Sequence, residues 1–583
     1  MTTSLHTEIP GATRNGGATR IQLEGVRKQA IDMGRSRLLV AGALIMMAFA
    51  AISVRLVDLM VVGGTDTALA SRQRMTIQLP VSRASIVDRN GVLIATSLPT
   101  ASLYADPALV LDPREAASQL VSVLTDLDVD SVYKKITLKK RFVWLKRNLS
   151  PDEHYRVNAL GLPGFGFKRE ERRVYPQGPL LAHVVGLTDT DGRGTAGVER
   201  YFDETLEGSF KTLRLSLDVR VQALVREELL KTMLEFKAVG ATAVVLDVNN
   251  GEVLSMVSLP DFDPNVPGSA NDDAIFNRVT KGVYEMGSTF KLFTAAMALD
   301  AGTVSLDGGY DASEPITVAR FTISDFHGKN RWLSVPEILI HSSNIGAAKM
   351  ALDVGTERQK MYLNNLGLLS KTEIELPEVG KPLLPARWRE INTMTISFGH
   401  GIAVSPLQLA SGVATLVNGG LRHPTTLLAR DKNDSIPTTR VIDESTSSAM
   451  RGLMRLVVKY GTGKNAEADG YSVGGKTGTA DKLINGAYTQ DKRMASFVGA
   501  FPIEKPRFVV LVVVDEPEGL KRTFNYATGG WVAAPVVSQI VSRMGPLLGI
   551  APRSQMASNY NETNSPDGFL KTMKDLERSF AAR

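Results

Sequence analysis

Between residues 38 and 54 the chain carries an unbroken run of apolar and small residues without a charge. Arg55 interrupts the run, which resumes over residues 59–62, and the whole stretch is near the minimum length of a helix that crosses a bilayer. Ala48-Phe-Ala50 resembles a signal-peptide cleavage site, but the leader is very long and apolar residues continue beyond it. The pattern therefore predicts an uncleaved membrane anchor.

The charges ahead of this stretch predict its orientation. Basic residues outnumber acidic ones there, which is typical of an end that stays in the cytoplasm. We predict a cytoplasmic tail over residues 1–36, an anchor helix over 37–62, and a remainder that lies outside the cytoplasmic membrane, in the periplasm. No second hydrophobic stretch of spanning length follows, so the pattern predicts a single-pass protein.

Residues 63–230 mix short strands, turns and charged stretches. The Asn90-Gly91 pair, with apolar residues on both sides, predicts a tight turn between two strands. No nucleophile is paired with a base in this region, so we expect a non-catalytic domain of mixed α+β structure. Charged residues such as Arg172 and Glu199 are expected to be exposed on it.

A second pattern begins near residue 239. Apolar runs separated by turns predict hairpins over residues 241–258 and 495–514, with helical segments between them. This order predicts an antiparallel sheet sandwiched by helices over residues 231–550. Residues 551–583 are polar and poor in β-branched side chains, and we expect a frayed tail there.

The composition of the 583 residues narrows the chemistry. There is no cysteine, which excludes disulfides, thiolate catalysis and cysteine-ligated zinc. The seven histidines show no metal-binding spacing, so we expect no metal site and no cofactor. The formal net charge of +6 is modest, and no tract of basic and aromatic residues suggests nucleic acid as a partner.

Three short motifs carry the candidate chemistry: Ser288-Thr-Phe-Lys291, Ser342-Ser-Asn344 and Lys476-Thr-Gly478. In this order they form the signature of a serine acyl-enzyme in which a lysine follows the nucleophile by one helical turn. Fragments of the pattern also occur in Ser131-Val-Tyr-Lys134 and Ser269-Ala-Asn271. Only the set that starts at Ser288 has all three parts in order.

Ser288 opens a segment that is apolar nearly all round, which predicts a buried helix. At the first turn its backbone N–H is free and lies at the positive end of the helix dipole, which suits an oxyanion. Lys291 shares the helix face of Ser288, so its amine can reach the hydroxyl and supply the base that serine needs. The lysine can do so only if burial or a second cation keeps it neutral.

Ser342 and Asn344 precede a helix-prone stretch, where a plain helix cap would use the same residue types. In the catalytic interpretation, Ser342 relays a proton from Lys291 to the leaving amine, and Asn344 holds an amide of the substrate. The second motif is therefore predicted to complete the site of the first.

Lys476-Thr-Gly-Thr479 follows two glycines and predicts an edge strand that lines the cleft. Gly478 would let another backbone approach closely, so that a peptide adds itself as an extra strand. Thr477 and Thr479 fall on one face by the two-residue period of a strand. Their hydroxyls and the ammonium of Lys476 are expected to hold a terminal carboxylate.

With these motifs, the chain resembles the class B penicillin-binding proteins, above all the division-specific peptidoglycan D,D-transpeptidases of the FtsI type. The resemblance covers nearly all of residues 37–550. It includes five further matching stretches: Arg173-Val-Tyr-Pro176, Ala182-His-Val-Val-Gly186, Gly194-Thr-Ala-Gly197-Val-Glu199, Ser397-Phe-Gly-His-Gly401 and Thr528-Gly-Gly-Trp-Val-Ala-Ala-Pro535. The family usually has glycine where Ala84 stands and proline where Met286 stands, and neither departure removes a catalytic group.

The resemblance implies a fold and a set of roles. A single membrane helix would be followed by a pedestal domain and by a transpeptidase domain of the β-lactamase-like fold. Ser288 would be the nucleophile and Lys291 its base. The backbone N–H groups of Ser288 and Thr479 would form the oxyanion hole.

It also implies a function at the septum of the dividing cell, at the inner membrane. The enzyme would cross-link stem peptides of the septal wall from a pentapeptide substrate, with loss of the terminal D-Ala, and β-lactams would inhibit it covalently. No glycosyltransferase-like domain fits between residue 63 and the catalytic region. A membrane-embedded glycosyltransferase of the FtsW type and other division proteins are therefore the implied partners.

Other functions stay open at this point. The elongation-specific transpeptidase and a D,D-carboxypeptidase use the same chemistry. A serine β-lactamase fits less well, because such enzymes usually lack a large membrane-linked pedestal. A β-lactam sensor or scaffold would acylate, or merely bind, without turnover, although the intact motifs argue against an inactive site.

Overall fold

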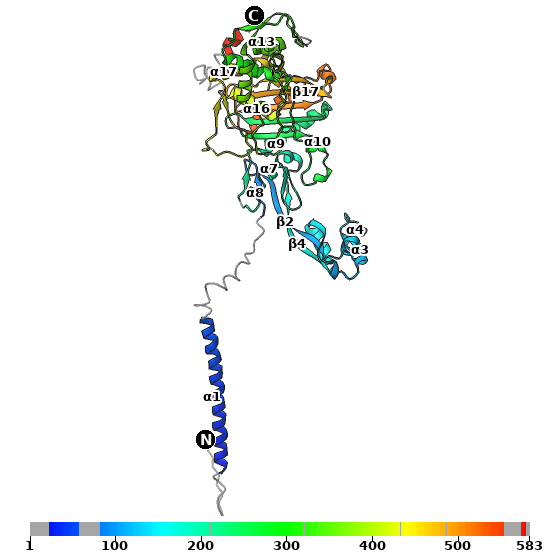
Figure 1. Cartoon of the computed structure of the whole chain (residues 1–583), viewed down its shortest axis with the longest axis vertical. Coiled ribbons are helices and arrows are strands. Elements are labelled where there is room, and N and C mark those ends of the chain that lie inside the picture. Colours follow the sequence, from blue (N-terminus) through cyan, green and yellow to red (C-terminus); the bar gives the residue numbers. More distant parts are fainter. Residues whose placement is uncertain are drawn as a thin grey trace, which may run out of the picture. The chain divides into compact units, whose positions relative to one another are not determined.

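The computed structural model describes residues 22–57, 82–209, 211–318, 321–431, 433–484, 487–552 and 573–578. By their contacts, residues 1–80 and 81–583 form two separate units. The described part of the first unit is one helix, α1 (Gln22–Val57), in which Leu39–Val57 is long and apolar enough to cross a membrane (Figure 1). The helix begins well before residue 37, and the last predicted anchor residues, 58–62, lie outside the described part of the chain.

A five-stranded sheet forms the framework of the N-terminal half of the second unit, with the order β3-β2-β1-β7 and with β4 also paired to β2. Its strands are β1 (Ile86–Val87), β2 (Leu93–Ala105), β3 (Val143–Leu149), β4 (Phe165–Val174) and β7 (Leu213–Arg214). The two long strands, β2 and β4, pair from Thr96↔Val174 to Ala105↔Phe165 and run out from the body of the unit towards α3 and α4 (Figure 1). The predicted turn at Asn90-Gly91 is confirmed, since β1 and β2 pair antiparallel on either side of it.

Short helices cover this sheet at its two ends. At the far end of β2 and β4, a small apolar core that includes Leu103, Leu120 and Leu145 is closed by three helices. These are α3 (Pro113–Val123), α4 (Val129–Ile136) and α5 (Pro151–Ala159). Nearer the body lie α6 (Ala182–Val185), β5 (Leu187–Thr188), β6 (Gly194–Ala196), α7 (Gly197–Tyr201) and α8 (Asp203–Leu206).

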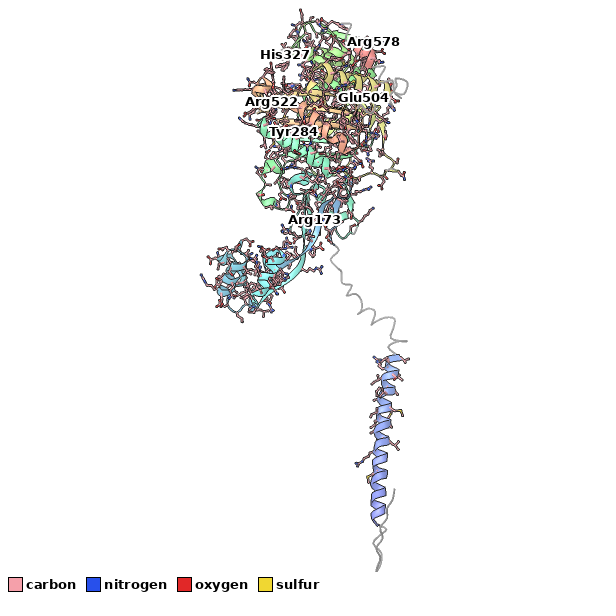
Figure 2. The ribbon with its side chains drawn as sticks, turned by 180° about the vertical axis from the view of Figure 1, so that it is seen from behind. Arg173, Tyr284, His327, Glu504, Arg522 and Arg578 are labelled. Carbon is pink, nitrogen blue, oxygen red and sulfur yellow. The ribbon has the colours of Figure 1, made fainter. Side chains whose placement is uncertain are left out.

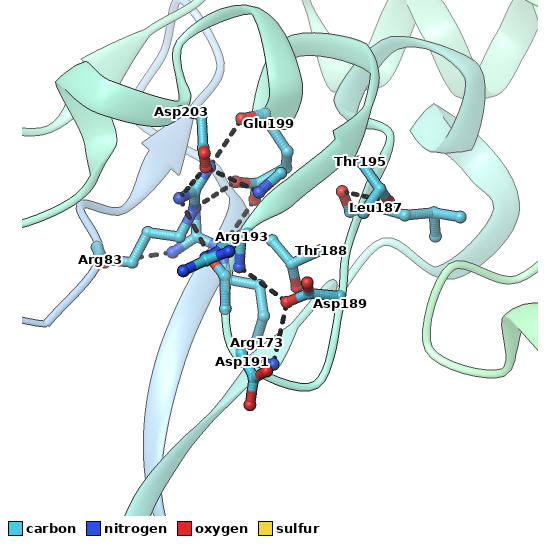
Figure 3. Close-up of polar contacts among 12 residues, drawn as sticks. Arg83, Arg173, Leu187, Thr188, Asp189, Asp191, Arg193, Thr195, Glu199 and Asp203 are labelled. Carbon is cyan, nitrogen blue, oxygen red and sulfur yellow. Dashed lines mark hydrogen bonds and ion pairs between the residues drawn. The ribbon is translucent and has the colours of Figure 1, made fainter.

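A buried ion cluster ties the start of this unit to α7 (Figure 3). Nε of Arg83 lies 2.6 Å from Oε2 of Glu199, and Nε of Arg173 lies 2.7 Å from Oε1 of the same carboxylate. Arg83 also reaches Asp203, with 2.7 Å between Nη1 and Oδ1. Arg173 lies where the long strands enter the larger body of the unit (Figure 2).

The expectation that Glu199 is exposed is therefore wrong. Its side chain has 0% exposure, because two arginines that are distant in the sequence compensate its charge inside the protein. Arg172, one residue before Arg173 on β4, is exposed as expected.

The second half of the unit is built on an antiparallel sheet with the order β16-β17-β18-β8-β9. Its strands are β8 (Gly240–Asp247), β9 (Val253–Leu259), β16 (Gly474–Ile484), β17 (Ala487–Phe501) and β18 (Phe508–Asp515). Both predicted hairpins are thus confirmed, and β16 is an edge strand as expected.

Helices cover both faces of this sheet, which confirms the predicted sandwich. One face packs on α9 (Val219–Glu235) and α18 (Ala533–Leu547), and the other on α16 (Pro406–Val417) and α17 (Glu444–Tyr460), behind which lies α11 (Lys291–Asp300). In β18, Val509, Leu511 and Val513 enter the core on the α16 side, and the alternate residues enter the core on the α9 side. The strand is apolar at every position because both of its faces are buried.

Shorter elements complete this second part of the unit. Among the described residues, this part also contains the α-helices α10 (Asp272–Ile275), α12 (Val335–His341), α13 (Asn344–Val354), α14 (Thr356–Asn365) and α15 (Glu390–Ile396). Three small antiparallel pairs are β10 (Gly309–Asp311) with β13 (Trp332–Ser334), β11 (Ile316–Val318) with β12 (Phe321–Ile323), and β14 (Leu421–Arg422) with β15 (Thr439–Arg440).

Beyond residue 552, the described part of the C-terminal tail is a short helical segment, residues 573–578. Met573 and Leu576 are buried against the main core, and Nζ of Lys459 on α17 lies 2.7 Å from Oε1 of Glu577. The expectation of a frayed tail is wrong for these six residues, because their apolar side chains have a place in the core.

Candidate functional site

The nucleophile candidate stands at a sharp turn before a buried helix. Gly287 has a φ of +56° and opens a single 3-10 turn, η5 (Gly287–Phe290), which continues into α11. Ser288 is half-buried on this turn, and its Oγ lies 3.0 Å from Nζ of Lys291. The serine and lysine therefore lie on one helix face and in contact, as their spacing predicted.

Lys291 is almost fully buried and is surrounded by oxygen atoms of the second motif. Its Nζ lies 2.5 Å from the carbonyl oxygen of Ser342, 3.1 Å from Oγ of Ser342 and 2.8 Å from Oδ1 of Asn344. Ser342 ends α12 in the left-handed region, with φ 59° and ψ 44°. This conformation, uncommon for a residue with a side chain, turns both its carbonyl and its hydroxyl towards the lysine.

The environment of Lys291 favours a neutral amine. Burial and the neighbouring charge of Lys476 hold the pKa of Lys291 well below its ordinary value, while Asp325 acts in the opposite direction. A neutral amine has two N–H groups and one lone pair. The carbonyl of Ser342 and Oδ1 of Asn344 can only accept, so they take the two N–H groups and leave the lone pair for the proton of Ser288.

Lys476 reaches the same hydroxyl from the opposite side. It is fully buried on β16, and its Nζ lies 3.0 Å from Oγ of Ser342 and 3.3 Å from Oγ1 of Thr477. Burial lowers the pKa of Lys476 to about 7. The lysine is therefore able to change charge near neutral pH, and a bound carboxylate would favour its protonated form.

The two threonines of the third motif are each held by a neighbouring loop. Oγ1 of Thr477 lies 2.7 Å from Oγ1 of Thr462, and Oγ1 of Thr479 accepts a hydrogen bond of 3.1 Å from the N–H of Gly529. These contacts fix the hydroxyls beside the free edge of β16.

Other parts of the same chain pack so closely on Gly478 that no side chain fits at this position. A Cβ atom at this position would lie 2.3 Å from Oγ of Ser496 and 2.5 Å from the carbonyl oxygen of Met286, next to the nucleophile turn. The sequence predicted that glycine here admits the backbone of a peptide. In the structure, the backbone that approaches is that of residue 286.

The two N–H groups of the predicted oxyanion hole belong to the nucleophile turn η5 and to the strand β16. A Cβ atom at Gly287 would lie 2.6 Å from the carbonyl oxygen of Thr479, so the turn that carries Ser288 packs directly on β16. The backbones of Ser288 and Thr479 are thereby brought into one neighbourhood, and their role as N–H donors stays a prediction.

The structure thus brings the eight predicted catalytic and substrate-binding residues into one site. They are Ser288, Lys291, Ser342, Asn344, Lys476, Thr477, Gly478 and Thr479. The two competing fragments lie elsewhere and have structural partners. The N–H of Ser131 donates to Asp128 at the start of α4, and Asn271 caps α10. Within the described residues, no three His, Asp or Glu side chains come together in a way that would hold a metal ion.

Asp325 and Thr462 were missed in the sequence analysis, and Gly529, in the matching stretch that begins at Thr528, was assigned no role there. All three residues contact residues of the motifs. Asp325 lies in the loop between β12 and β13, and it accepts hydrogen bonds from residues 343, 344 and 345. No spacing in the sequence signals these contacts, because they form only when distant loops meet.

Two domain families match the chain. The description "Penicillin-binding Protein dimerisation domain" matches residues 78–228, and "Penicillin binding protein transpeptidase domain" matches residues 241–542. The two matches cover the N-terminal and the catalytic halves of the second unit.

Similar proteins carry related names. The probable peptidoglycan D,D-transpeptidase FtsI of Caulobacter vibrioides is 39% identical over 493 residues, which are 82% of this chain and 84% of that protein. The peptidoglycan D,D-transpeptidase FtsI of Escherichia coli K12 is 32% identical over 520 residues, 83% of this chain and 87% of that protein. The transpeptidase domain of penicillin-binding protein 3 from Burkholderia pseudomallei has a TM-score of 0.53 and 33% identity, and the match covers 58% of this chain and 97% of that one.

Proposed function

This chain belongs to the penicillin-binding proteins and is a peptidoglycan D,D-transpeptidase of the FtsI type, and on that premise we propose that Ser288 is its nucleophile and that it cross-links the septal wall of a dividing cell. One observation carries the assignment of the site. Contacts of 3.0, 3.1 and 3.0 Å link Ser288, Lys291, Ser342 and Lys476 in series, from the nucleophile to the carboxylate-binding strand.

Acylation uses this series of contacts. Oγ of Ser288 attacks the carbonyl carbon of the penultimate D-Ala, and its proton moves to the neutral amine of Lys291, 3.0 Å away. The carbonyl oxygen gains negative charge and is stabilised by the backbone N–H groups of Ser288 and Thr479. The bond between this carbon and the nitrogen of the last D-Ala then breaks, and an ester to Ser288 remains.

The leaving amine needs a proton, and Ser342 is placed to supply one. Its hydroxyl lies between the amines of Lys291 and Lys476, so a proton can pass from Lys291 through Oγ of Ser342 to the departing nitrogen. In the second half of the reaction, the amine of another stem peptide attacks the ester and releases Ser288 with its proton. A β-lactam forms the same ester when its ring amide opens.

Substrate recognition follows from the free edge of β16. A stem peptide that adds to this edge as an antiparallel strand places its C-terminal carboxylate at Lys476. The fixed hydroxyls of Thr477 and Thr479 lie along the same edge.

We also propose the cellular setting. The protein is a single-pass membrane protein with the helix Leu39–Val57 as its membrane span, the N-terminus lies in the cytoplasm, and the catalytic half acts in the periplasm. A membrane-embedded glycosyltransferase of the FtsW type would supply glycan strands. The names of the FtsI relatives and the single anchor support this setting.

Reconstitution tests the activity and its residues. The purified full-length protein is mixed with lipid-linked pentapeptide and a partner polymerase, and the products are digested and separated. We expect cross-linked dimers that disappear with penicillin or in a Ser288→Ala variant. Acylation without dimers would favour a sensor, and loss of D-Ala without dimers a carboxypeptidase.

Localisation and pedestal variants test the setting. A fluorescent fusion should form bands at the septum, whereas labelling along the side wall would favour the elongation-specific alternative. The pedestal, which lacks a nucleophile–base pair, is proposed to transmit activity to the polymerase. Arg172→Glu, at an exposed position on β4, should lower polymerase activity and leave penicillin labelling of Ser288 unchanged.

A further inference from the structure

One carboxylate outside the three motifs holds the second motif in place. Asp325 follows β12 and faces the start of α13, where Oδ1 accepts hydrogen bonds from the N–H groups of Asn344 (2.5 Å) and Ile345 (3.0 Å). Oδ2 accepts a hydrogen bond of 2.7 Å from the hydroxyl of Ser343. The carboxylate therefore binds three consecutive residues of the segment that carries the motif.

These contacts determine how Asn344 faces the catalytic lysine. The side-chain Nδ2 of Asn344 donates to the carbonyl of Ser324, at 2.9 Å, one residue before Asp325. With its N–H and its amide nitrogen both held by residues 324 and 325, Asn344 has its Oδ1 directed at Nζ of Lys291, 2.8 Å away. The loop after β12 thus sets the orientation of a group that contacts the base.

The charge of Asp325 also acts on Lys291. Two charged groups face the amine from other elements: Lys476 on β16, which disfavours its protonation, and Asp325, which favours it. The carboxylate lies at a helix N-terminus, where a negative charge is itself stabilised. Its charge therefore opposes the effect of Lys476 on Lys291.

We propose that Asp325 is a positioning residue of the transpeptidase reaction, which holds Asn344 against the Lys291 amine and balances the charge of Lys476. The inference rests on the proposed roles of Ser288 and Lys291. It explains why a carboxylate in a loop outside the motifs contacts two residues of the second motif and Ile345, which follows it.

Two substitutions separate the geometric part from the electrostatic part. Asp325→Asn keeps an oxygen for the N–H groups of residues 344 and 345 and removes the charge. Loss of the charge lowers the pKa of Lys291 further, so the rise of the acylation rate with pH should move to lower pH. Asp325→Ala removes the acceptor as well and should reduce the maximal rate roughly tenfold, as expected for buried donors left unsatisfied beside a reacting group.

The measurement is the second-order rate of labelling by a fluorescent penicillin, followed over pH in the full-length protein, with thermal unfolding recorded for each variant. Asp112→Asn is the control, since Oδ1 of Asp112 also accepts hydrogen bonds from two consecutive N–H groups at the start of a helix, α3, at an exposed position outside the site. It should leave the pH profile unchanged.

The outcomes are distinct. The proposal is supported if the rise of the acylation rate moves to lower pH in Asp325→Asn but not in Asp112→Asn. The proposal is overturned if the rise stays at the wild-type pH in Asp325→Asn while this variant unfolds like the wild type. Penicillin labelling that survives in Ser288→Ala would instead overturn the proposed function, whatever Asp325 does.

Discussion

Nζ of Lys476 lies 3.0 Å from Oγ of Ser342, although the two residues are 134 positions apart in the sequence. The same hydroxyl faces Lys291 at 3.1 Å, so Ser342 is the only link between the two buried amines in the described part of the site. The carboxylate-binding strand and the nucleophile's base therefore act through one side chain.

The role of this hydroxyl is tested by two substitutions at Ser342. Ser342→Gly removes Oγ and relieves the left-handed strain of about 1 kcal/mol that the Cβ of Ser342 carries at φ 59°, whereas Ser342→Ala removes Oγ and keeps that strain. Because both lack the relay, both should acylate more slowly by about a hundredfold or more, measured as the rate of penicillin labelling. If Ser342→Gly labels at the wild-type rate, the relay is not needed for acylation, and only the backbone carbonyl of residue 342 matters.

Acylation needs a neutral Lys291 and a protonated Lys476, so its rate should depend on pH with a bell-shaped profile. Lys291 must be neutral to accept the serine proton, and its lowered pKa places the rising limb well below the pKa of an ordinary lysine. Lys476 must be protonated to bind the penicillin carboxylate, and its pKa of about 7 in the free protein predicts a falling limb on the alkaline side. The two lysines interact, so the limbs describe the pair.

Lys476→Arg tests the origin of the falling limb, because the guanidinium group of arginine stays charged over the whole pH range. The rising limb should persist in this variant and the falling limb should vanish. A rising limb near the pKa of free lysine, or a falling limb that survives the substitution, would show that other groups control the reaction.

The buried cluster in the pedestal predicts an effect on stability and none on chemistry. Glu199→Gln leaves Arg173 buried without its counter-charge and leaves Arg83 with Asp203 alone, so the free energy of unfolding should fall by about 3 kcal/mol. Denaturant unfolding measures this fall, with Glu204→Gln, at an exposed position on α8, as the control. Equal stability of the two variants would contradict the account of the cluster. A charge reversal at Glu199 therefore tests folding, and exposed positions such as Arg172 are the ones that test partner coupling.

The sequence predicted those features that depend on local pattern. Apolar runs and turns indicated the hairpins of β8–β9 and β17–β18, and the spacing of Ser288 and Lys291 indicated a shared helix face. These features depend on residues that are close in the chain, where period and turn chemistry decide the structure.

Features that depend on distant contacts were not predictable in this way. Glu199 lies among residues of mixed polarity, and their pattern gives no sign that it will be buried with Arg83 and Arg173. Asp325 precedes Ser342 by 17 positions and contacts its motif only through the fold. Thr462 and Gly529 support the edge strand from separate loops. Each of these residues acquires its role from tertiary structure, which a local pattern does not contain.

The central claim is that Ser288 forms the acyl-enzyme, and mass spectrometry of the penicillin-treated full-length protein tests it most directly. The account predicts one adduct, located on the tryptic peptide of residues 282–291, and none in a Ser288→Ala variant that retains the wild-type unfolding profile. An adduct that persists in this variant, or that maps to Ser131, would contradict the assignment.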